Sequence, residues 1–294
     1  MDKDVLEKYM LAGRIAAQVR EESKKFVVVG ASLMDIAERI ESSIREKGGL
    51  PAFPVNLSVN DEAAHYTPVP ADSRKISKDD VLKVDIGVHV DGYIGDTAYT
   101  ACFDDKHSNL VKAAEEALEK AIPMCVPGAA VDDISGVIED TIKSFGYLPV
   151  ANLTGHGLEQ WEGHAEPTIH NTRVKYGYRL KEDEIIAIEP FATNGAGLIK
   201  DSEPSVIFSL LGRKPSRSQE SRRIMNEMGA FHGMPFAERW LGSSFSTRLA
   251  MRELRKSGTL YEYPVLREVR KGIVSQAEHT VIVGKEPVVT TRIA

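Results

Sequence analysis

The sequence predicts an α+β fold, because segments with helical periodicity alternate with segments in which apolar residues recur at every second position. Two amphipathic helices come before a strong hairpin signal, two more helices follow it, and short apolar strands occupy the second half of the chain. The 294 residues, 42% hydrophobic and 27% charged, can bury a sizeable core in one large domain or two.

The composition excludes several classes of protein. The 37 basic and 43 acidic side chains give a net charge of -6, which disfavours a chain-wide surface for nucleic acid or anionic membranes. Cys102 and Cys125 are too few for a disulfide framework or a thiolate zinc cluster, and they indicate a reducing compartment. The N-terminus has no apolar signal segment, and no apolar run approaches the ~20 residues of a spanning helix. We therefore expect a soluble cytoplasmic protein.

Two helices are predicted at the start of the chain. Apolar side chains recur at helical spacing in residues 3–22, and we expect this face to pack on a sheet. A second helix begins at Ser32, which with Asp35 resembles a capping box, and ends at Gly48-Gly49. The two apolar stripes are Val5, Tyr9, Ala12, Ala16, Val19 and then Ile36, Ile40, Ile44.

A β-hairpin is predicted from residue 81, where VLKVDIGVHV and YIGDTAYTACF flank the turn signal Asp91-Gly92. A two-residue turn there pairs Gly87 with Asp96. Asp85 and Asp96 then share one face as diagonal neighbours, with backbones ~7–8 Å apart. Two carboxylates that converge in this way need a cation, and two solvated surface acids are the alternative.

The remaining elements complete the α+β pattern. One helix is predicted over residues 108–122, closed by Pro123, and another over residues 132–145, capped by Asp132 and ended by Gly146. The stretch NLTGHGLEQWEGHAEP is expected to be rich in loops. The apolar runs EIIAIEP and AEHTVIV are typical of buried strands.

Four acids and one histidine stand out chemically. Glu189 and Glu278 lie in apolar strand segments, where a charge is costly unless it is compensated, and His156 stands between two flexible glycines. Taken singly, each is also compatible with an ordinary structural role. With Asp85 and Asp96 they carry a charge of -4, which two divalent cations balance. This donor set suits manganese, iron(II), cobalt or zinc, and a pair of such ions activates water for hydrolysis.

Residues 205–263 differ in composition from the rest of the chain. They hold ten Arg and Lys against five acids, with short helical patterns around MNEMGA and STRLAMRELRKSG. A small helical insertion with solvated charges is the simpler interpretation, and a contact with nucleic acid or the ribosome is the alternative.

Five motifs, in this order along the chain, resemble the type II methionine aminopeptidases. The absence of a long charged N-terminal extension resembles the archaeal form of that family. The motifs are AAHYTP at 63–68, KVDIGVHVDGYIGD at 83–96, GHG at 155–157, AIEPFAT at 187–193 and AEHT at 277–280.

The resemblance implies a pita-bread fold of two pseudo-symmetric halves, built from residues 1–204 and 264–294, with residues 205–263 as the type II helical insertion. It implies a hydrolase that uses two divalent ions to remove the initiator methionine from nascent polypeptides, preferring a small second residue. A monomer in the cytoplasm is expected, with a transient ribosome contact and no membrane or specific nucleic acid as partner.

The resemblance also assigns roles to the five candidate ligands. Asp85 matches the bidentate ligand of one metal ion, and Asp96 and Glu278 match the carboxylates that bridge both ions. His156 and Glu189 match the remaining ligands of the other ion. Glu189 also matches the position that accepts the proton of the attacking water, a role that requires hydrogen-bond reach.

Further residues match the substrate site of the family. His65 corresponds to a histidine near the scissile amide nitrogen, and His164 to one near the carbonyl oxygen, where it would stabilise the developing oxyanion. Phe53, Tyr263 and Ile207 match the walls of a pocket for methionine, although ordinary core packing is the alternative for them. An ordinary structural role is expected for the other histidines, His89, His107, His170, His232 and His279.

Two other functions remain open at this point. A hydrolase of Xaa-Pro bonds shares the five-ligand site, but the insertion and AAHYTP argue against it. A catalytically silent pita-bread protein that binds nucleic acid or ribosomes is a rival of another class, and such proteins lose metal ligands. All five positions hold competent donors here, which favours an active enzyme.

Overall fold

Every helix predicted from apolar periodicity is present in the computed structural model, which describes residues 1–293. No helix in that range is both long and apolar enough to cross a membrane. The α-helices are α1 (Lys3–Ser23), α2 (Leu33–Glu46), α3 (Ser108–Ala121), α4 (Val131–Ser144), α5 (Gln219–Gly229) and α6 (Phe245–Lys256), and the 3-10 helices are η1 (Asp105–His107), η2 (Ile122–Met124) and η3 (Glu238–Leu241).

The helix starts follow the predicted capping in one case and not in another. Ser32 caps α2, and its Oγ accepts a hydrogen bond from the Asp35 backbone N–H at 3.3 Å. The predicted cap of α4 is wrong, because Asp132 lies inside the first turn and Ala130 occupies the cap position. The Asp132 carboxylate instead accepts a backbone hydrogen bond from Tyr176 at 3.1 Å, so it fixes a neighbouring loop.

Seven strands of the main sheet follow one another in the order β1-β4-β5-β15-β9-β7-β8. Two further strands join this sheet, β2 by pairing with β4 and β16 by pairing with β15. Smaller sheets have the orders β14-β10-β6 and β12-β11-β13-β3. The strands are β1 (Leu50–Pro51), β2 (Asn56–Val59), β3 (Glu62–Ala64), β4 (Val81–Val90), β5 (Tyr93–Cys102), β6 (Leu148–Pro149), β7 (Thr154–Glu159), β8 (Glu162–His170), β9 (Ile185–Ile188), β10 (Phe191–Thr193), β11 (Ile199–Leu210), β12 (Phe236–Ala237), β13 (Leu260–Glu268), β14 (Val274–Gln276), β15 (Glu278–Ile282) and β16 (Val288–Val289).

The register predicted for the β4–β5 hairpin is confirmed. Gly87 pairs with Asp96, and the ladder continues without a bulge from the turn to the far end. Asp91 and Gly92 both have positive φ angles, 50° and 85°, as a type I′ turn requires. Asp85 and Asp96 therefore lie on one face of the sheet, as the turn signal predicted.

The stretch 152–167, predicted to be rich in loops, instead contains most of the β7–β8 hairpin. The glycines beside His156 provide room rather than flexibility, because β7 lies very close to its neighbours. A Cβ on Gly155 would lie 2.3 Å from the Ala187 carbonyl oxygen, and one on Gly157 would lie 2.0 Å from that of Glu166. Only glycine permits this close approach of strand to strand.

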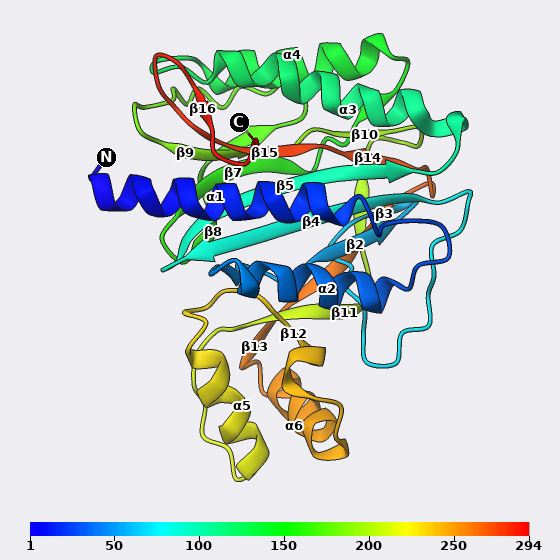
Figure 1. The fold of residues 1–294 in the computed structure, drawn as a ribbon, viewed down its shortest axis with the longest axis vertical. Helices are drawn as coiled ribbons and strands as arrows, with labels where there is room; N and C mark the ends of the chain where they lie inside the picture. Colours follow the sequence, from blue (N-terminus) through cyan, green and yellow to red (C-terminus); the bar gives the residue numbers. More distant parts are fainter. Residues whose placement is uncertain (294) are drawn as a thin grey trace.

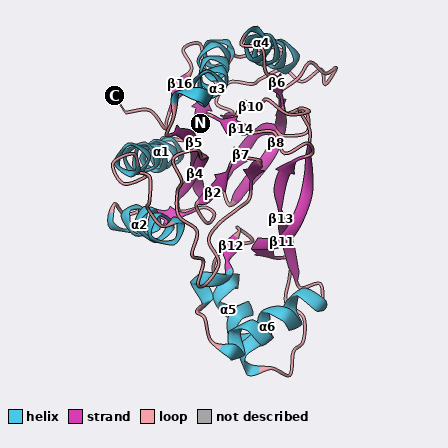
Figure 2. Ribbon diagram, turned by 90° about the vertical axis from the view of Figure 1, so that its right-hand side faces the viewer, coloured by secondary structure: helices cyan, strands magenta, loops and turns pink. Residues whose placement is uncertain are grey.

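The main sheet has a helical face and an opposite, open face (Figures 1 and 2). α1 and α2 pack on β4, and alternate residues of that strand enter their hydrophobic core: Leu82, Val84, Ile86 and Val88. α3 and α4 cover β9 and β15 in the same way, through a second core that includes Ile186, Ile188 and Val281. The residues between these apolar positions, Asp85 and Gly87 among them, therefore face the other side, towards the sheet of β11 and β13 (Figure 2).

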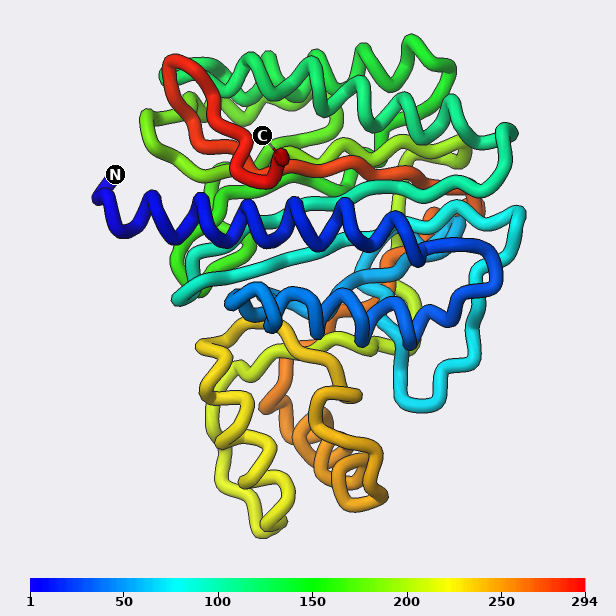
Figure 3. The backbone as a smooth tube through the Cα atoms, in the orientation of Figure 1, coloured from blue at the N-terminus to red at the C-terminus, as the bar shows by residue number. Residues whose placement is uncertain are grey.

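Residues 205–263 leave the body along β11 and return along β13, and these two strands pair with each other (Figure 3). The segment between them has a small core, in which Ile224 of α5 and Met251 of α6 pack together with Phe208 of β11. The division into residues 1–204 with 264–294 and the insertion 205–263 stays a prediction.

A buried ion pair fastens this segment to α2. Arg239 of η3 contacts Glu41, and less than a tenth of either side chain is exposed. Glu41 also accepts hydrogen bonds from Trp240 Nε1 at 2.7 Å and from the Val55 backbone at 3.2 Å. Because Arg239→Met leaves the Glu41 charge buried and uncompensated, we expect it to lower the free energy of unfolding by ~3–5 kcal/mol in urea denaturation.

An exposed ion pair provides the matched control. Arg173 and Asp140 form a pair of which more than half of each side chain is exposed, so Arg173→Met should leave the free energy of unfolding close to that of the wild type. Equal losses for the two substitutions would contradict the anchoring role of Arg239.

Candidate metal centre

Five neighbouring strands of the main sheet each bring one candidate ligand to the open face. In sheet order, β4 carries Asp85, β5 carries Asp96, β15 begins with Glu278, Glu189 follows the end of β9, and β7 carries His156. These residues are up to 193 positions apart in the chain, between Asp85 and Glu278. Strand pairing therefore brings together residues that are far apart in the sequence.

The register explains why all five side chains point the same way. Asp85 and Glu278 pair with the same residue of β5 from its two sides, and Asp96 lies two positions before that residue. His156 pairs with the residue two positions before Glu189, which in turn pairs with the residue two positions after Glu278. Residues that are paired, or two positions apart on one strand, share a face of the sheet.

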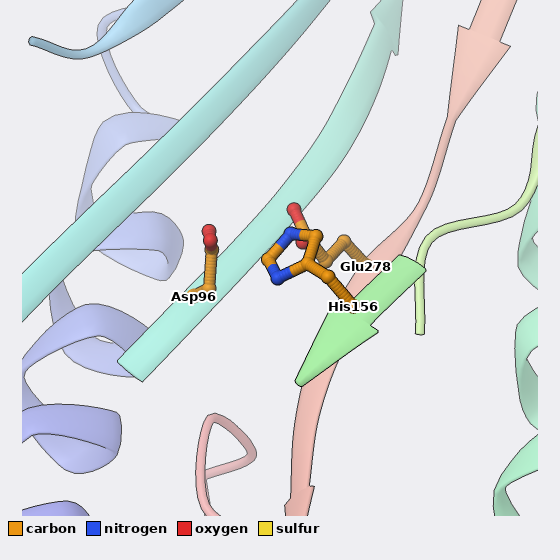
Figure 4. A group of neighbouring side chains, drawn as sticks. All are labelled: Asp96, His156 and Glu278. Carbon is orange, nitrogen blue, oxygen red and sulfur yellow. The ribbon is translucent and has the colours of Figure 1, made fainter. Parts of the chain in front are cut away.

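The side chains converge at close range. One ligand atom from each of Asp96, His156 and Glu278 lies within 4.8 Å of the other two, and Figure 4 shows these groups turned towards one another. His156 Nε2 is 3.5 Å from Glu189 Oε1. His156 Nδ1 donates to the Gly157 carbonyl at 3.3 Å, which leaves Nε2 unprotonated and free to bind a cation.

Burial and mutual repulsion shift the pKa values of the carboxyls and the histidine in this cluster. Burial raises the pKa of Asp85 to about 7. Burial, followed by the charges of the neighbouring carboxylates, raises the pKa values of Asp96, Glu189 and Glu278 well above their usual range. Burial also lowers the pKa of His156 to about 3, so its ring is neutral at pH 7.

These residues fit a divalent cation. Three buried carboxylate oxygens have no hydrogen-bond partner, namely Asp85 Oδ1, Asp96 Oδ1 and Glu278 Oε2. Buried carboxylate oxygens without a donor are costly unless a positive charge lies against them. Four carboxylates and one neutral imidazole are also ligands that hard or borderline divalent ions accept.

Metal removal should make stability depend on pH. Without metal, the folded chain raises the pKa values of these carboxyls, so it is most stable when they are protonated. This stability is fully present below the pKa values of the unfolded chain, about 4, and is lost as the pH rises through the pKa values of the folded chain. Because the pKa of Asp85 is about 7, the Tm of the chelated protein should fall between pH 5 and pH 8. The metal-loaded protein should not show this loss, so the gap in Tm should widen with pH.

Thermal unfolding at several pH values, with EDTA or with excess manganese, measures this gap. The variant Asp96→Asn/Glu278→Gln carries fewer ionisable groups in the cluster and should show a smaller fall in Tm with EDTA. Equal Tm values for the chelated and loaded wild type at pH 8 would contradict the crowding of acids.

A cavity of about 190 Å³ opens beside the cluster. Sites for drug-sized ligands measure roughly 300–1,000 Å³, so this volume suits a single small group. Besides the five candidate ligands, its lining contains every other site residue predicted from the sequence: Phe53, His65, His164, Ile207 and Tyr263. The other five histidines are not part of that lining.

His65 is held in an unusual backbone conformation at the cavity wall. Its φ angle is +64°, a region that a histidine adopts only at some cost. Its Nδ1 donates to the Pro264 carbonyl at 3.2 Å, which leaves Nε2 as an acceptor, and Tyr263 packs edge-on against the ring. Burial lowers the pKa of His65 to about 4, so the ring is neutral at pH 7.

His164, on β8, lies beside His156, with ring centroids 4.4 Å apart. The two histidines come from the paired strands β7 and β8, which the glycines of β7 bring together. His164 is solvent-accessible and lines the cavity, so it can reach a bound molecule while His156 stays buried.

Comparison with known proteins agrees with this arrangement. Residues 7–285 match metallopeptidase family M24. The chain belongs to metallopeptidase family M24.

Among the relatives of this M24 chain are methionine aminopeptidases from Thermococcus onnurineus and Methanocaldococcus jannaschii. The first is 47% identical over 96% of this chain and 98% of its own length, and the second 40% identical over 99% and 100%. A solved methionine aminopeptidase from Thermotoga maritima has a TM-score of 0.73 at 22% identity, covering 100% of this chain and 98% of its own. The predicted pita-bread fold is therefore confirmed.

The sequence did not predict two polar residues that lie beside the five candidate ligands. Gln276 Nε2 lies 3.5 Å from Asp85 Oδ2 and 3.4 Å from Glu189 Oε2, so its amide bridges two candidate ligands. Asn56 pairs with Asp85 across β2 and β4 and lines the cavity. The two-residue period could have found Gln276, because it lies two positions before Glu278.

Gly87 leaves room for the cavity wall. A methyl group there would lie 2.2 Å from Cε1 of Phe53, so Gly87→Ala must displace the ring. We expect kcat/KM for peptide hydrolysis to fall about 10- to 100-fold with metal content unchanged, because small misplacements in a binding site are costly. Gly212→Ala is the control, since a Cβ there meets nothing within 4 Å. Unchanged kcat/KM in Gly87→Ala would remove Phe53 from the substrate pocket.

Proposed function

We propose that this M24 chain is a type II methionine aminopeptidase, of the archaeal-like form, that removes the initiator methionine from nascent polypeptides with a small second residue. The observation that carries the proposal is the convergence of four carboxylates and one imidazole from five adjacent strands beside a small cavity. The similarity to methionine aminopeptidases over nearly the whole chain supports it.

Asp85, Asp96, His156, Glu189 and Glu278 would hold two divalent ions, which would supply Lewis-acid activation of water and of the scissile carbonyl. Glu189 accepts the proton of the attacking water. Its place among the candidate ligands supports this role, because a carboxylate that contacts the ions would lie within hydrogen-bond reach of a water that they hold.

Two histidines act on the scissile amide. His65 is neutral, and its unprotonated Nε2 can accept a hydrogen bond from the amide N–H, because Nδ1 already donates to Pro264. His164 donates to the carbonyl oxygen and stabilises the negative charge that develops there. Their positions on the cavity lining support both roles.

The methionine side chain occupies the small cavity. Phe53, Ile207 and Tyr263 form its apolar wall, and Ile207 and Tyr263 are paired across β11 and β13. Met is unbranched and polarisable, so it fills a narrow apolar slot of this kind well.

The basic segment 205–263 contacts the ribosome transiently, and the enzyme acts as a cytoplasmic monomer without a membrane or a specific nucleic-acid partner. Exposed arginines on this segment, including Arg217, Arg248 and Arg252, support the contact. Co-sedimentation with ribosomes should be lost as salt rises to ~0.5 M, because such contacts are electrostatic. Sedimentation unaffected by salt, or absent at low salt, would contradict this contact.

A peptide panel tests the main proposal. With cobalt, manganese, iron(II) or zinc supplied in turn, Met-Gly and Met-Ala peptides should release methionine faster than Met-Leu peptides. Preference for Xaa-Pro peptides would assign the chain to the proline-specific hydrolases instead. A chain that retains no metal after dialysis into cobalt or manganese would favour a silent binding protein.

A further inference from the structure

A buried arginine lies behind the candidate metal centre, on the helical face of the sheet. Arg20 of α1 is only 8% exposed. Its Nη1 donates to Thr97 Oγ1 at 2.6 Å and to the Thr291 carbonyl at 3.1 Å, and it lies 3.2 Å from His279 Nδ1. Its Nε donates to Glu21 Oε1 at 3.1 Å, which supplies the opposite charge.

Two of these partners are chain neighbours of candidate ligands. Thr97 follows Asp96 on β5, and His279 follows Glu278 on β15. Successive residues of a strand point to opposite faces, so the ligands face the metal centre while their neighbours face Arg20. One guanidinium thus contacts the reverse side of both strands.

The backbone ladder between these two strands is short. Only two residue pairs link β5 and β15 in the sheet ladder, whereas β4 and β5 share ten. Side chains complete the link: Thr97 Oγ1 donates to the Glu278 carbonyl at 2.9 Å, and the Asp96 backbone N–H donates to Thr280 Oγ1 at 2.7 Å. The separation of the two strands sets how closely the two carboxylates approach each other.

We propose that Arg20 is a positioning residue for the metal centre. Through Thr97 and His279 it holds β5 and β15 at the separation at which Asp96 and Glu278 can share cations. The inference deepens the proposed function and rests on its metal site, but it does not depend on which peptide is cleaved.

Arginine suits this position because its planar group carries several N–H donors in a fixed fork. Thr97 Oγ1 uses its own hydrogen for Glu278, so it needs an external donor, and Arg20 supplies one. A lysine keeps a charged donor but not the fork, so Arg20→Lys should restore the function in part, and Arg20→Met should not.

The affinity for Co²⁺, measured by competition with a chromophoric chelator, tests this role without any peptide. Loss of a residue that orients metal ligands typically weakens metal binding 10- to 100-fold, and we expect this of Arg20→Met, with a smaller loss in Arg20→Lys. The visible absorption of bound Co²⁺ should also change in Arg20→Met, because the ligand geometry changes.

Arg239→Met is the matched control for general destabilisation. It removes another nearly buried arginine, which lies on η3 outside the main sheet and pairs with α2, and should leave Co²⁺ affinity unchanged although it destabilises the chain. Wild-type Co²⁺ affinity in folded Arg20→Met would overturn the proposal.

Thr97 provides a second variant if Arg20→Met does not fold. Thr97→Val removes the hydroxyl at nearly constant volume and should weaken Co²⁺ binding, whereas Thr97→Ser keeps the hydroxyl and should bind Co²⁺ like the wild type. Equal affinity in both variants would also overturn the proposal. A wild type that binds Co²⁺ but spares Met-Ala peptides would contradict only the proposed function, because the affinities of the variants can still be compared.

Discussion

Replacing His164 by alanine is expected to lower kcat for a Met-Ala peptide by ~100-fold or more while the bound metal is retained. The His164 ring lines the cavity beside His156 but is not one of the five candidate ligands, so its removal should take away the proposed donor to the developing oxyanion and leave the candidate donor set intact. His65→Ala should have an effect of similar size, because it removes the proposed acceptor for the amide N–H.

Steady-state kinetics combined with elemental analysis of the purified variants measure both effects. His170→Ala is the control, since His170 lies on the same strand as His164 but outside the cavity lining. Near-normal kcat in either active-site variant would remove the role assigned to that histidine, and loss of metal would make it a ligand instead.

The substitution Glu189→Gln should lower kcat by ~10²- to 10⁴-fold, the range that a general base contributes. The amide keeps an oxygen at nearly the same place, so it can still contact a cation, but it cannot take a proton from water. Gln276 Nε2, 3.4 Å from the Glu189 carboxylate, would remain beside the new side chain.

Glu159→Gln, an exposed acid at the end of β7, controls for the change in charge and should behave like the wild type. Metal content must be measured beside kcat. If Glu189→Gln keeps its metal and loses less than ~10-fold in kcat, another group accepts the proton.

The β4–β5 hairpin could be predicted in detail because its determinants are local. A turn dipeptide that accepts positive φ and two strands with a two-residue period fix the partner of every residue. That register places Asp85 and Asp96 together before any other part of the fold is known.

Other features depend on residues far apart in the chain. The residues flanking His156 indicated a loop, since glycine is typical of loops, and only the neighbouring strands show that β7 needs glycine for close packing. The predicted helix cap at Asp132 was wrong because the Asp132 carboxylate binds the backbone of a loop 44 residues further along the chain. The network of Arg20 joins residues separated by up to 271 positions, which no local pattern reveals.

The residues alone indicated a set of donors for two metal ions. Which residue binds which ion, and which substrate is cleaved, came only from the resemblance to a known family. Charge balance among four acids and an imidazole indicates how many cations fit. The choice of substrate depends instead on a cavity whose lining comes from many strands, among them β4, β8, β11 and β13. These strands meet only in the folded chain.

Metal stoichiometry, measured together with activity, tests the central claim most directly. Isothermal titration of the chelated protein with Mn²⁺ or Co²⁺ should show two equivalents bound per chain, with release of methionine from Met-Ala peptides appearing as the sites fill. The variant Asp96→Asn/Glu278→Gln should bind at most one ion, weakly. A metal-free protein that still releases methionine, or a wild type that binds no divalent ion, would contradict the account.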